Sequence, residues 1–283
     1  MLKSPRMKIE EDVLKHLYLE LGLTAKEIAE KYNGYAAHNI KYYLRQYGLV
    51  NNKYKINHVL SEIQKDLIIG SALGDGGFDY RNDSTSLNVS HAENQKSYCQ
   101  MKFELIKDIC NHRELRFKDR SNEKDGHKRQ SQFTFNTKYI VAMNEFYKMS
   151  RYDLMDNLNS NSMMIWLLDD GHKYEPRGKN KNSSYELSVG RFTLAEVAYA
   201  QKIINDKFNL NTGLKYNEKW KNPQYTITFD VEQSYLLSQI ISNCEMGYIA
   251  KESMSYKLID TIHINRITQN YKVVQEMMSR SIS

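Results

Sequence analysis

Cysteine is scarce in this sequence of 283 residues: only Cys99, Cys110 and Cys244 occur, widely spaced and odd in number. Such a set builds no disulfide framework and is typical of a reducing, intracellular compartment. Long apolar runs are also missing, and the first residues mix basic and acidic side chains where a signal peptide would have an apolar segment. We therefore expect a soluble cytoplasmic protein that has no membrane partner.

Two functional signatures are missing as well. The glycines from Gly70 to Gly77 have neither the G-x-G-x-x-G spacing nor the lysine of a phosphate-binding loop, which argues against a nucleotide site. The chain has no N-terminal nucleophile and no C-terminal His-Asn pair, so it is not itself a self-splicing intein. A hydrophobic share of 41% is enough for a packed core, and a net charge of +6 with a pI near 8.9 favours a polyanionic partner without proving one.

Two stretches of the chain end in the same way. Residues 68–76 and 163–171 are short apolar, helix-like runs that place an aspartate, Asp75 or Asp170, at the eighth position and a glycine at the ninth. A similar order of predicted helices and strands follows each stretch. This pattern indicates an internal duplication, and it predicts that the two aspartates meet at a pseudo-twofold axis.

Each aspartate is expected at the C-terminal end of its helix, where the helix dipole disfavours a carboxylate. Two neighbouring carboxylates repel further, and Mg²⁺, which prefers oxygen ligands, removes both penalties. We therefore predict a metal site formed by Asp75 and Asp170, with Gly74 and Asp169 as further candidate ligands. Asp169 competes with Asp170 as the metal ligand of the second stretch. However, it is the seventh residue of that stretch, so its side chain should point toward the helix contact rather than outward. Alternatively, each aspartate simply ends a surface helix, an interpretation that fits a single motif better than two matched ones.

Gly70 and Gly74 lie one turn apart on one helical face, so another helix can approach this backbone closely. The corresponding residues of the second stretch, Ile165 and Asp169, are larger. We predict that the two helices cross here, with a flat glycine face against a bulkier one.

Periodicity predicts the element order αββαββα twice. In the first half we expect helices at 61–75, 93–110 and 139–149 and strands at 78–81, 86–91, 114–120 and 130–136. In the second half we expect helices ending at 170 and spanning 194–208 and 234–242, with strands at 172–174, 185–191, 213–219 and 224–230. The predicted fold class is therefore α+β, with two pseudo-symmetric halves.

Residues 8–48 are predicted to form three short helices that precede the duplicated region. A capping box from Thr24 to Glu27 begins the second helix, and Gly48 ends the third. The tight second turn resembles a helix-turn-helix module, whose third helix would expose side chains suited to phosphate and base-edge contacts: His38, Asn39, Lys41, Tyr42 and Arg45. The alternative is a three-helix packing unit with a merely solvated polar face.

The duplicated stretches resemble the motifs of the LAGLIDADG homing endonuclease family, in its two-motif, single-chain form. The first motif matches at Gly70, Asp75 and Gly76, and the second mainly at Asp170 and Gly171. The order of elements matches too, so the resemblance covers roughly residues 61–258.

The resemblance implies that each half forms a saddle-shaped antiparallel sheet over DNA and that Asp75 and Asp170 bind the metal ions. It also implies a basic residue near each catalytic centre. In the second half this residue would be Lys257, in the segment Met254–Leu258 that is similar to the family's ending. In the first half the matching place falls near Asn136, which is not basic, so Lys138 is the candidate there.

Polar and basic residues at alternate positions of the predicted strands could face the DNA grooves, because alternate side chains of a strand share one face of a sheet. Together with the third N-terminal helix they form the candidate DNA-binding set: Lys41, Arg45, Arg81, Asn88, Arg116, Lys118, Arg120, Gln130, Gln132, Arg191, Lys215, Asn217, Lys219 and Gln224. A solvated sheet face would have the same pattern.

We interpret the chain as a monomeric, metal-dependent, site-specific endonuclease that hydrolyses one phosphodiester on each strand of double-stranded DNA. One alternative is a LAGLIDADG-derived DNA- or RNA-binding protein without cleavage, such as a transcription regulator or an intron maturase. A plain helix-turn-helix regulator is a weaker one, because it leaves the duplication unexplained. The expected domains are 1–57 (helix-turn-helix unit and linker), 58–158 and 159–258 (the two halves), and a tail at 259–283.

Overall fold

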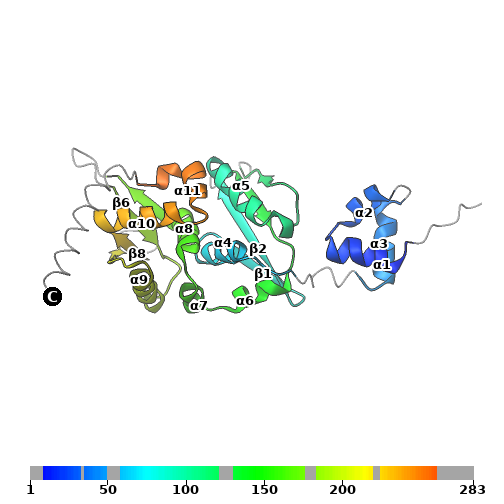
Figure 1. The fold of residues 1–283 in the computed structure, drawn as a ribbon, viewed down its shortest axis with the longest axis horizontal. Helices are drawn as coiled ribbons and strands as arrows, with labels where there is room; N and C mark the ends of the chain where they lie inside the picture. The colour runs from blue at the N-terminus through cyan, green and yellow to red at the C-terminus, as the bar shows by residue number, and fades with distance from the viewer. Residues whose placement is uncertain are drawn as a thin grey trace, which may run out of the picture.

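The computed structural model describes residues 9–32, 35–49, 58–120, 130–175, 183–218 and 224–259. They form two hydrophobic cores, a small one between Ile9 and Leu49 and a large one between Leu60 and Ile259. Figure 1 shows the small N-terminal unit beside the larger body. The predicted linker at 50–57 and nearly all of the predicted tail lie outside the described residues.

The N-terminal unit contains the three predicted helices. They are α1 (Glu11–Lys15), which continues as a π-helical turn (His16–Glu20), α2 (Ala25–Lys31) and α3 (Ala37–Gln46). The predicted capping box is present, because the Glu27 amide donates to the Thr24 hydroxyl and the Thr24 amide donates to the Glu27 carboxylate. Gly48, with φ near +64°, follows α3 in a conformation that glycine adopts without strain. The polar residues predicted to be exposed on α3 are all exposed.

The larger body repeats the order αββαββα, as predicted. The first half consists of α4 (Glu62–Leu73), β1 (Gly77–Arg81), β2 (Ser84–Ala92), α5 (Lys96–Leu105), β3 (Arg116–Lys118), β4 (Gln132–Asn136) and α6 (Asn144–Lys148). The second half consists of α8 (Ser160–Asp170), β5 (Gly171–Tyr174), β6 (Ser184–Ser188), α9 (Leu194–Phe208), β7 (Gly213–Asn217), β8 (Gln224–Phe229) and α10 (Val231–Asn243).

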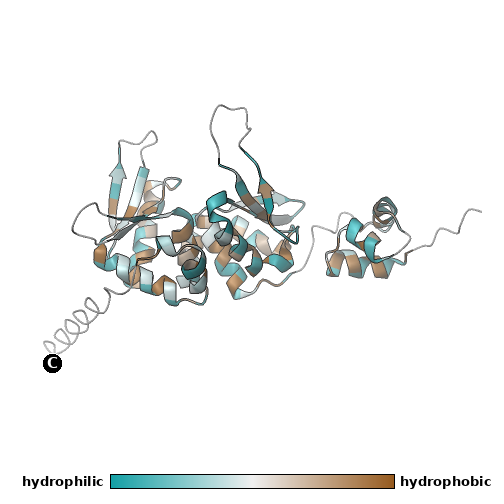
Figure 2. Ribbon diagram, turned by 90° about the horizontal axis from the view of Figure 1, so that it is seen from above, coloured by the Kyte–Doolittle hydropathy of each residue, from teal (hydrophilic) through white to brown (hydrophobic). Residues whose placement is uncertain are grey.

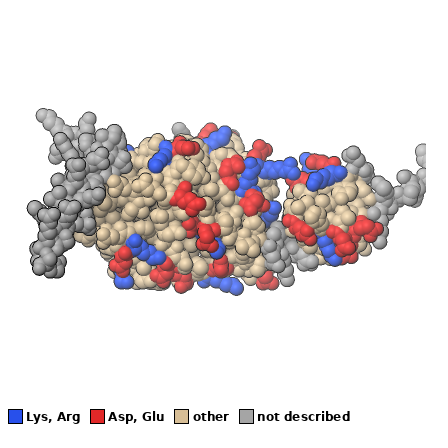
Figure 3. All heavy atoms as spheres, in the orientation of Figure 1, with Lys and Arg blue, Asp and Glu red and all other residues tan. Residues whose placement is uncertain are grey.

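The two sheets have the same topology. Their strand orders are β1-β2-β4-β3 and β5-β6-β8-β7, and every neighbouring pair is antiparallel. Both sheets lie on one side of the body and the helices cover the other side (Figure 2). The helical side carries positive and negative side chains interspersed over a largely uncharged surface (Figure 3). This pseudo-symmetric α+β arrangement is the predicted fold class.

Several details differ from the prediction. The helix expected at 139–149 is α6 preceded by the 3-10 turn Val141–Met143, and the strand expected at 114–120 is limited to β3. The helix expected at 93–110 is α5 flanked by two 3-10 turns, Glu93–Gln95 and Lys107–Ile109, because Gln95 (φ −106°) and Ile106 (φ −127°) both leave the α-helical conformation. Two short helices were not predicted, α7 (Arg151–Asp156) between the halves and α11 (Gly247–Ser253) near the end. Six or seven residues give too few turns for a clear apolar period.

Candidate active site at the crossing of α4 and α8

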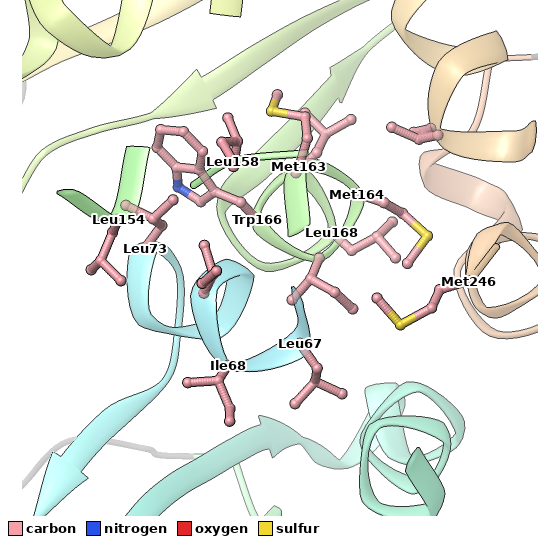
Figure 4. Packing of buried hydrophobic residues seen from close by; sticks show 14 of the residues in the cluster. Leu67, Ile68, Leu73, Leu154, Leu158, Met163, Met164, Trp166, Leu168 and Met246 are labelled. Carbon is pink, nitrogen blue, oxygen red and sulfur yellow. The ribbon is translucent and has the colours of Figure 1, made fainter. Parts of the chain in front are cut away.

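Helices α4 and α8 cross in close contact at the centre of the large core. An added Cβ on Gly70 would lie 2.5 Å from the Ser162 carbonyl oxygen and 2.6 Å from the Ile165 Cβ, and one on Gly74 would lie 2.6 Å from the Asp169 Cβ. The predicted contact of a glycine face with a bulkier face is therefore confirmed. Apolar side chains of both helices, such as Leu67, Met163 and Trp166, belong to one buried cluster, which Figure 4 shows together with residues that pack around the crossing.

A buried carboxylate fastens the N-terminal parts of the same two helices. The Asp66 side chain of α4 accepts hydrogen bonds from the side-chain amide of Asn159 at 2.6 Å and from the side-chain amide of Asn161 at 2.9 Å. Asn159 also begins α8, because its side chain accepts from the Ser162 amide. The helix pair is thus fixed far from the ends that carry Asp75 and Asp170.

Asp75 and Asp170 lie where α4 and α8 end, and their carboxylates interact. Burial raises the pKa of Asp75, and the Asp169 charge raises it further. Burial, followed by the charges of Asp75 and Asp169, raises the pKa of Asp170 to about 7. Arg191 and Lys257 oppose both shifts. The centre therefore concentrates negative charge in a partly dehydrated place, which a cation would stabilise.

Asp169 points into the helix contact, as expected for the seventh position. Its side chain is fully buried and forms an ion pair with the equally buried Lys102 of α5. One carboxylate oxygen accepts from the Tyr98 hydroxyl at 2.7 Å and from Lys102 Nζ at 3.1 Å. The other accepts from Lys102 Nζ at 3.0 Å and from the Asp75 amide at 3.2 Å. Both oxygens of Asp169 are therefore occupied by protein donors.

His91, at the end of β2, lies against this group. Its Nδ1 is 3.8 Å from an Asp75 oxygen, and its Nε2 is 3.4 Å from Lys102 Nζ and 3.9 Å from an Asp169 oxygen. Burial and, next, the Lys102 charge lower the pKa of His91 to about 4, so the imidazole is neutral near pH 7. Asp75, His91 and Asp169 each offer a possible ligand atom within 4.8 Å of one another.

Beside Asp170 the surface opens into a pocket of about 390 Å³. Its walls come from the end of α4 with Gly74, from the segment that follows β6, and from Arg151 and Gln224. Arg191 belongs to this wall, so the structure places this predicted DNA-binding residue next to the acidic centre. Space and positive charge thus adjoin the second aspartate.

The predicted DNA-binding residues that lie within strands share one face of each sheet, whereas Arg120, Gln130 and Arg191 lie beyond the ends of the strands in which they were expected. In the first sheet Arg116 is opposite Thr134 and Lys118 is opposite Gln132, while Asn88 is opposite Asn136. In the second sheet Lys215 is opposite Thr226 and Asn217 is opposite Gln224. Arg81 of β1 lies on the first of these faces by the same alternation.

Several of these side chains are bonded to one another. Arg116 donates to Asn136, Arg120 Nη1 donates to Gln132 at 3.3 Å, and Asn217 donates to Thr226 at 2.9 Å. Lys215 forms an ion pair with Glu186 at 3.0 Å. Of the other candidates, Lys41, Arg45 and Gln130 are exposed, whereas Lys219 lies outside the described residues.

Residues 65–237 match the LAGLIDADG DNA endonuclease family. The chain belongs to this family. The match includes both motif helices and both sheets, so the resemblance inferred from the two motifs is confirmed.

Individual relatives of this LAGLIDADG protein agree with the assignment. A probable intron-encoded endonuclease 1 of Wickerhamomyces canadensis is 29% identical over 104 residues, which are 35% of this chain and 45% of that protein. The alignment with this curated relative thus spans less than half of the relative's length. The solved structure of the homing endonuclease I-WcaI bound to its DNA recognition sequence has a TM-score of 0.61 at 23% identity, covering 83% of this chain and 97% of that one. This likeness shows a common fold. In the described ranges, no helix has the length and apolar character needed to cross a membrane.

The basic residues of this LAGLIDADG centre are partly those predicted. Lys257 reaches it from the 3-10 turn Ser255–Lys257, where its Nζ donates to the Leu168 carbonyl oxygen. Burial lowers the pKa of Lys257, and the charges of Asp169, Asp75 and Asp170 oppose that shift. The predicted proximity of Lys257 is therefore observed.

Lys138 lies elsewhere, contrary to the prediction that it assists the first centre. Its Nζ donates to the Asp108 carbonyl oxygen at 3.3 Å and lies beside Gly22 of the N-terminal unit. There the hydrogen bond from the Thr24 amide is the main cause that lowers the pKa of Glu27, and the charge of Lys138 lowers it further by a smaller amount. The ammonium group at the first centre belongs to Lys102 instead.

Sequence reasoning missed Lys102 and His91, although a signal for Lys102 was present. Lys102 stands three residues after Cys99 and four after Tyr98, within the buried stripe of α5. A lysine in such a stripe requires a buried partner, because an unpaired ammonium is costly there. His91 had no comparable signal, since a core-facing histidine at a strand end is ordinarily only packed.

Proposed function

We propose that this LAGLIDADG protein is a divalent-metal-dependent endonuclease that cuts both strands of a specific DNA site. The observation that carries the proposal is the convergence of Asp75 and Asp170, both with raised pKa, at the ends of two crossing helices. A pair of carboxylates held together against their mutual repulsion is costly without a cation. Ordinary helix termination does not explain the cost.

The donor set suits a hard divalent cation such as Mg²⁺. Asp75 and Asp170 supply carboxylate oxygens, and the backbone carbonyls of Gly74 and Asp169 in the same turns are further candidate donors. The Asp169 side chain is not proposed as a ligand, because both of its oxygens already accept hydrogen bonds. A divalent cation bound there would supply charge that activates water and stabilises the developing charge on the phosphodiester.

The remaining residues have roles in binding and orientation. We propose that Lys257, whose ammonium already lies among the three carboxylates, stabilises charge at the scissile phosphate. The polar faces of the two sheets would contact the DNA grooves, and Arg191 would contact the backbone near the cut. The exposed face of α3, with Lys41 and Arg45, would extend the contact to flanking DNA.

The relatives support this interpretation of the DNA surface. I-WcaI was solved with its DNA recognition sequence, and the Wickerhamomyces canadensis protein is described as a probable intron-encoded endonuclease. Because both motifs occur in one chain and meet at one centre, a monomer is sufficient for the proposed reaction. The retained pair Asp75 and Asp170 favours cleavage over a binding protein that has lost it.

Selection of cleaved sites from a randomised duplex library with Mg²⁺ tests the proposal. We expect a recurrent site that is cut on both strands. The variants Asp75→Asn and Asp170→Asn should still shift a duplex carrying that site in gels run with Ca²⁺, yet fail to linearise it with Mg²⁺. Normal linearisation by either variant would mean that the centre is assigned wrongly, and no selected site would refute the endonuclease.

A further inference from the structure

We infer that Asp169 and Lys102 form a positioning device for Asp75, so that a residue of the second motif serves the first aspartate. The geometric part of this inference is independent of the proposed function, whereas its consequence for strand cleavage rests on it. Asp169 acts through the backbone of Asp75, and it is therefore a positioning residue.

The backbone that follows α4 donates hydrogen bonds both to α4 itself and to a side chain of α8. The amides of Gly74 and Gly76 donate back into α4, to the carbonyl oxygens of Gly70 at 3.1 Å and Ser71 at 2.6 Å. The amide between them, that of Asp75, donates across the crossing to Asp169 at 3.2 Å. This bond orients the peptide from which the Asp75 side chain projects.

Lys102 keeps the acceptor in place. Its ammonium lies 3.0 and 3.1 Å from the two Asp169 oxygens, and neither side chain of the pair is exposed. The Tyr98 hydroxyl provides a further donor, which leaves no oxygen of Asp169 without a partner. A fully bonded pair of this kind holds one geometry, because any movement would leave a buried charge uncompensated.

Among the residues that the structure describes, the second aspartate has no equivalent device. Gly77, two residues after Asp75, is opposite Asn88, and His172, two residues after Asp170, is opposite Glu186. Asn88 and Glu186 are thus equivalent positions of the two halves. Counting the same number of residues from each, Ala200 is the counterpart of Lys102 and Val189 is the counterpart of His91, while Gly74 is the counterpart of Asp169 in the motifs.

Small or apolar residues thus replace all three polar ones, and the consequence is visible beside Asp170. Ala200 and Val189 are buried, and the pocket of about 390 Å³ is lined by both Gly74 and Val189. Polar side chains therefore hold the backbone of the exposed Asp75, whereas a pocket with an apolar wall adjoins the half-buried Asp170. Cleavage of the strand served by Asp75 should depend on Asp169, although Asp169 is adjacent to Asp170 in sequence.

Two double variants separate the acceptor from the charge. Lys102→Met with Asp169→Asn removes both charges but keeps a side-chain oxygen for the Asp75 amide. Lys102→Met with Asp169→Leu removes the charges and the acceptor while keeping a similar shape. Neither double variant, called the Asn variant and the Leu variant after residue 169, leaves an unpaired buried charge. If the Leu variant does not fold, Asp169→Ala replaces Asp169→Leu. Asp66→Asn is the control, because it disturbs the same helix pair away from the centre.

The first readout is hydrogen exchange at the Asp75 amide in metal-free protein, followed by NMR with ¹⁵N-aspartate. Exchange in the Leu variant should be faster than in the wild type by about tenfold or more, while the Asn variant and Asp66→Asn should retain most of the protection. Unchanged protection of Asp75 in the Leu variant would overturn the inference.

The second readout is strand-resolved nicking with Mg²⁺, in which Asp75→Asn identifies the strand served by Asp75. In the Leu variant this strand should slow by about tenfold or more relative to the other, and in the Asn variant much less. Equal slowing of both strands would overturn the positioning role in cleavage. Wild-type protein that cuts neither strand would refute the endonuclease, while the exchange measurement would still decide the geometric claim.

Discussion

Replacing Asp170 by asparagine should stabilise the metal-free protein, even though we expect the variant to lose the ability to linearise DNA. Burial and the charges of Asp75 and Asp169 raise the folded-state pKa of Asp170 from 3.8 to about 7. The folded state therefore binds this proton more tightly than the unfolded chain does. Stability falls as the pH rises from the unfolded value toward the folded one, and above pH about 7 the full penalty of the ionised carboxylate is present. Asparagine carries no charge and escapes the penalty.

The size of the effect follows from the pKa shift. A shift of about three units corresponds to about 4 kcal/mol. Solvent reaches part of the Asp170 side chain and its titration is coupled to that of Asp75, so we expect a gain of about 1–3 kcal/mol in the free energy of unfolding. The same variant loses a proposed metal ligand, so stability and activity should change in opposite directions.

Urea unfolding in EDTA at about pH 8 measures this difference, with Asp206→Asn as an exposed control that should change the free energy by less than about 0.5 kcal/mol. At about pH 5.5 the advantage of Asp170→Asn should shrink, because the wild-type carboxylate is then largely protonated. Saturating Ca²⁺ should stabilise the wild type more than the variant. A variant that is equally or less stable than the wild type in EDTA at the higher pH would refute the reasoning.

Three further expectations concern binding, catalysis and packing. Removing residues 1–57 should weaken DNA binding and reduce the salt slope by about 0.9 for each phosphate that the N-terminal unit neutralises, whereas an unchanged footprint and slope would make this unit a structural appendage. Lys257→Met should slow one strand more than the other when each is end-labelled and followed over time, and equal effects on both strands would contradict this asymmetry. Gly70→Ala should lower the free energy of unfolding by about 1–3 kcal/mol, because its Cβ would lie 2.5 Å from the Ser162 carbonyl oxygen. Gly77→Ala, whose Cβ would have no neighbour within 4 Å, is the control and should change it by less than about 0.5 kcal/mol.

The helix crossing could be predicted because its signals are local. Gly70 and Gly74 stand one turn apart, and Asp75 follows at the helix end, so one motif contains the contact surface and the charged group. The strand alternation was equally readable, because the period of two assigns a face without knowledge of the partner strand. These two patterns were sufficient for the fold class.

The Lys102–Asp169 pair could not be assigned in the same way, because its members lie 67 residues apart on different helices. Only the packing of α5 against the crossing brings them together. Lys138 shows the converse error. It was assigned to the centre because it lies two residues after Asn136 in sequence, but the turn after β4 points its side chain toward the Asp108 carbonyl oxygen. Short helices such as α7 depend on a capping box, here Ser150 with Asp153, rather than on periodicity.

The bonds among side chains on the sheet faces affect how the recognition site of this protein could be changed. Lys215 and Glu186 already satisfy each other, as do Arg116 and Asn136, so each contact with a base would exchange one partner for another. A base that cannot complete the exchange leaves two protein groups unmatched, and discrimination at that position is then a property of the pair. A change of DNA specificity should therefore substitute both members of a bonded pair, such as Lys215 and Glu186, at the same time. A single substitution would also leave the other member without its partner and so change which base that member can bind.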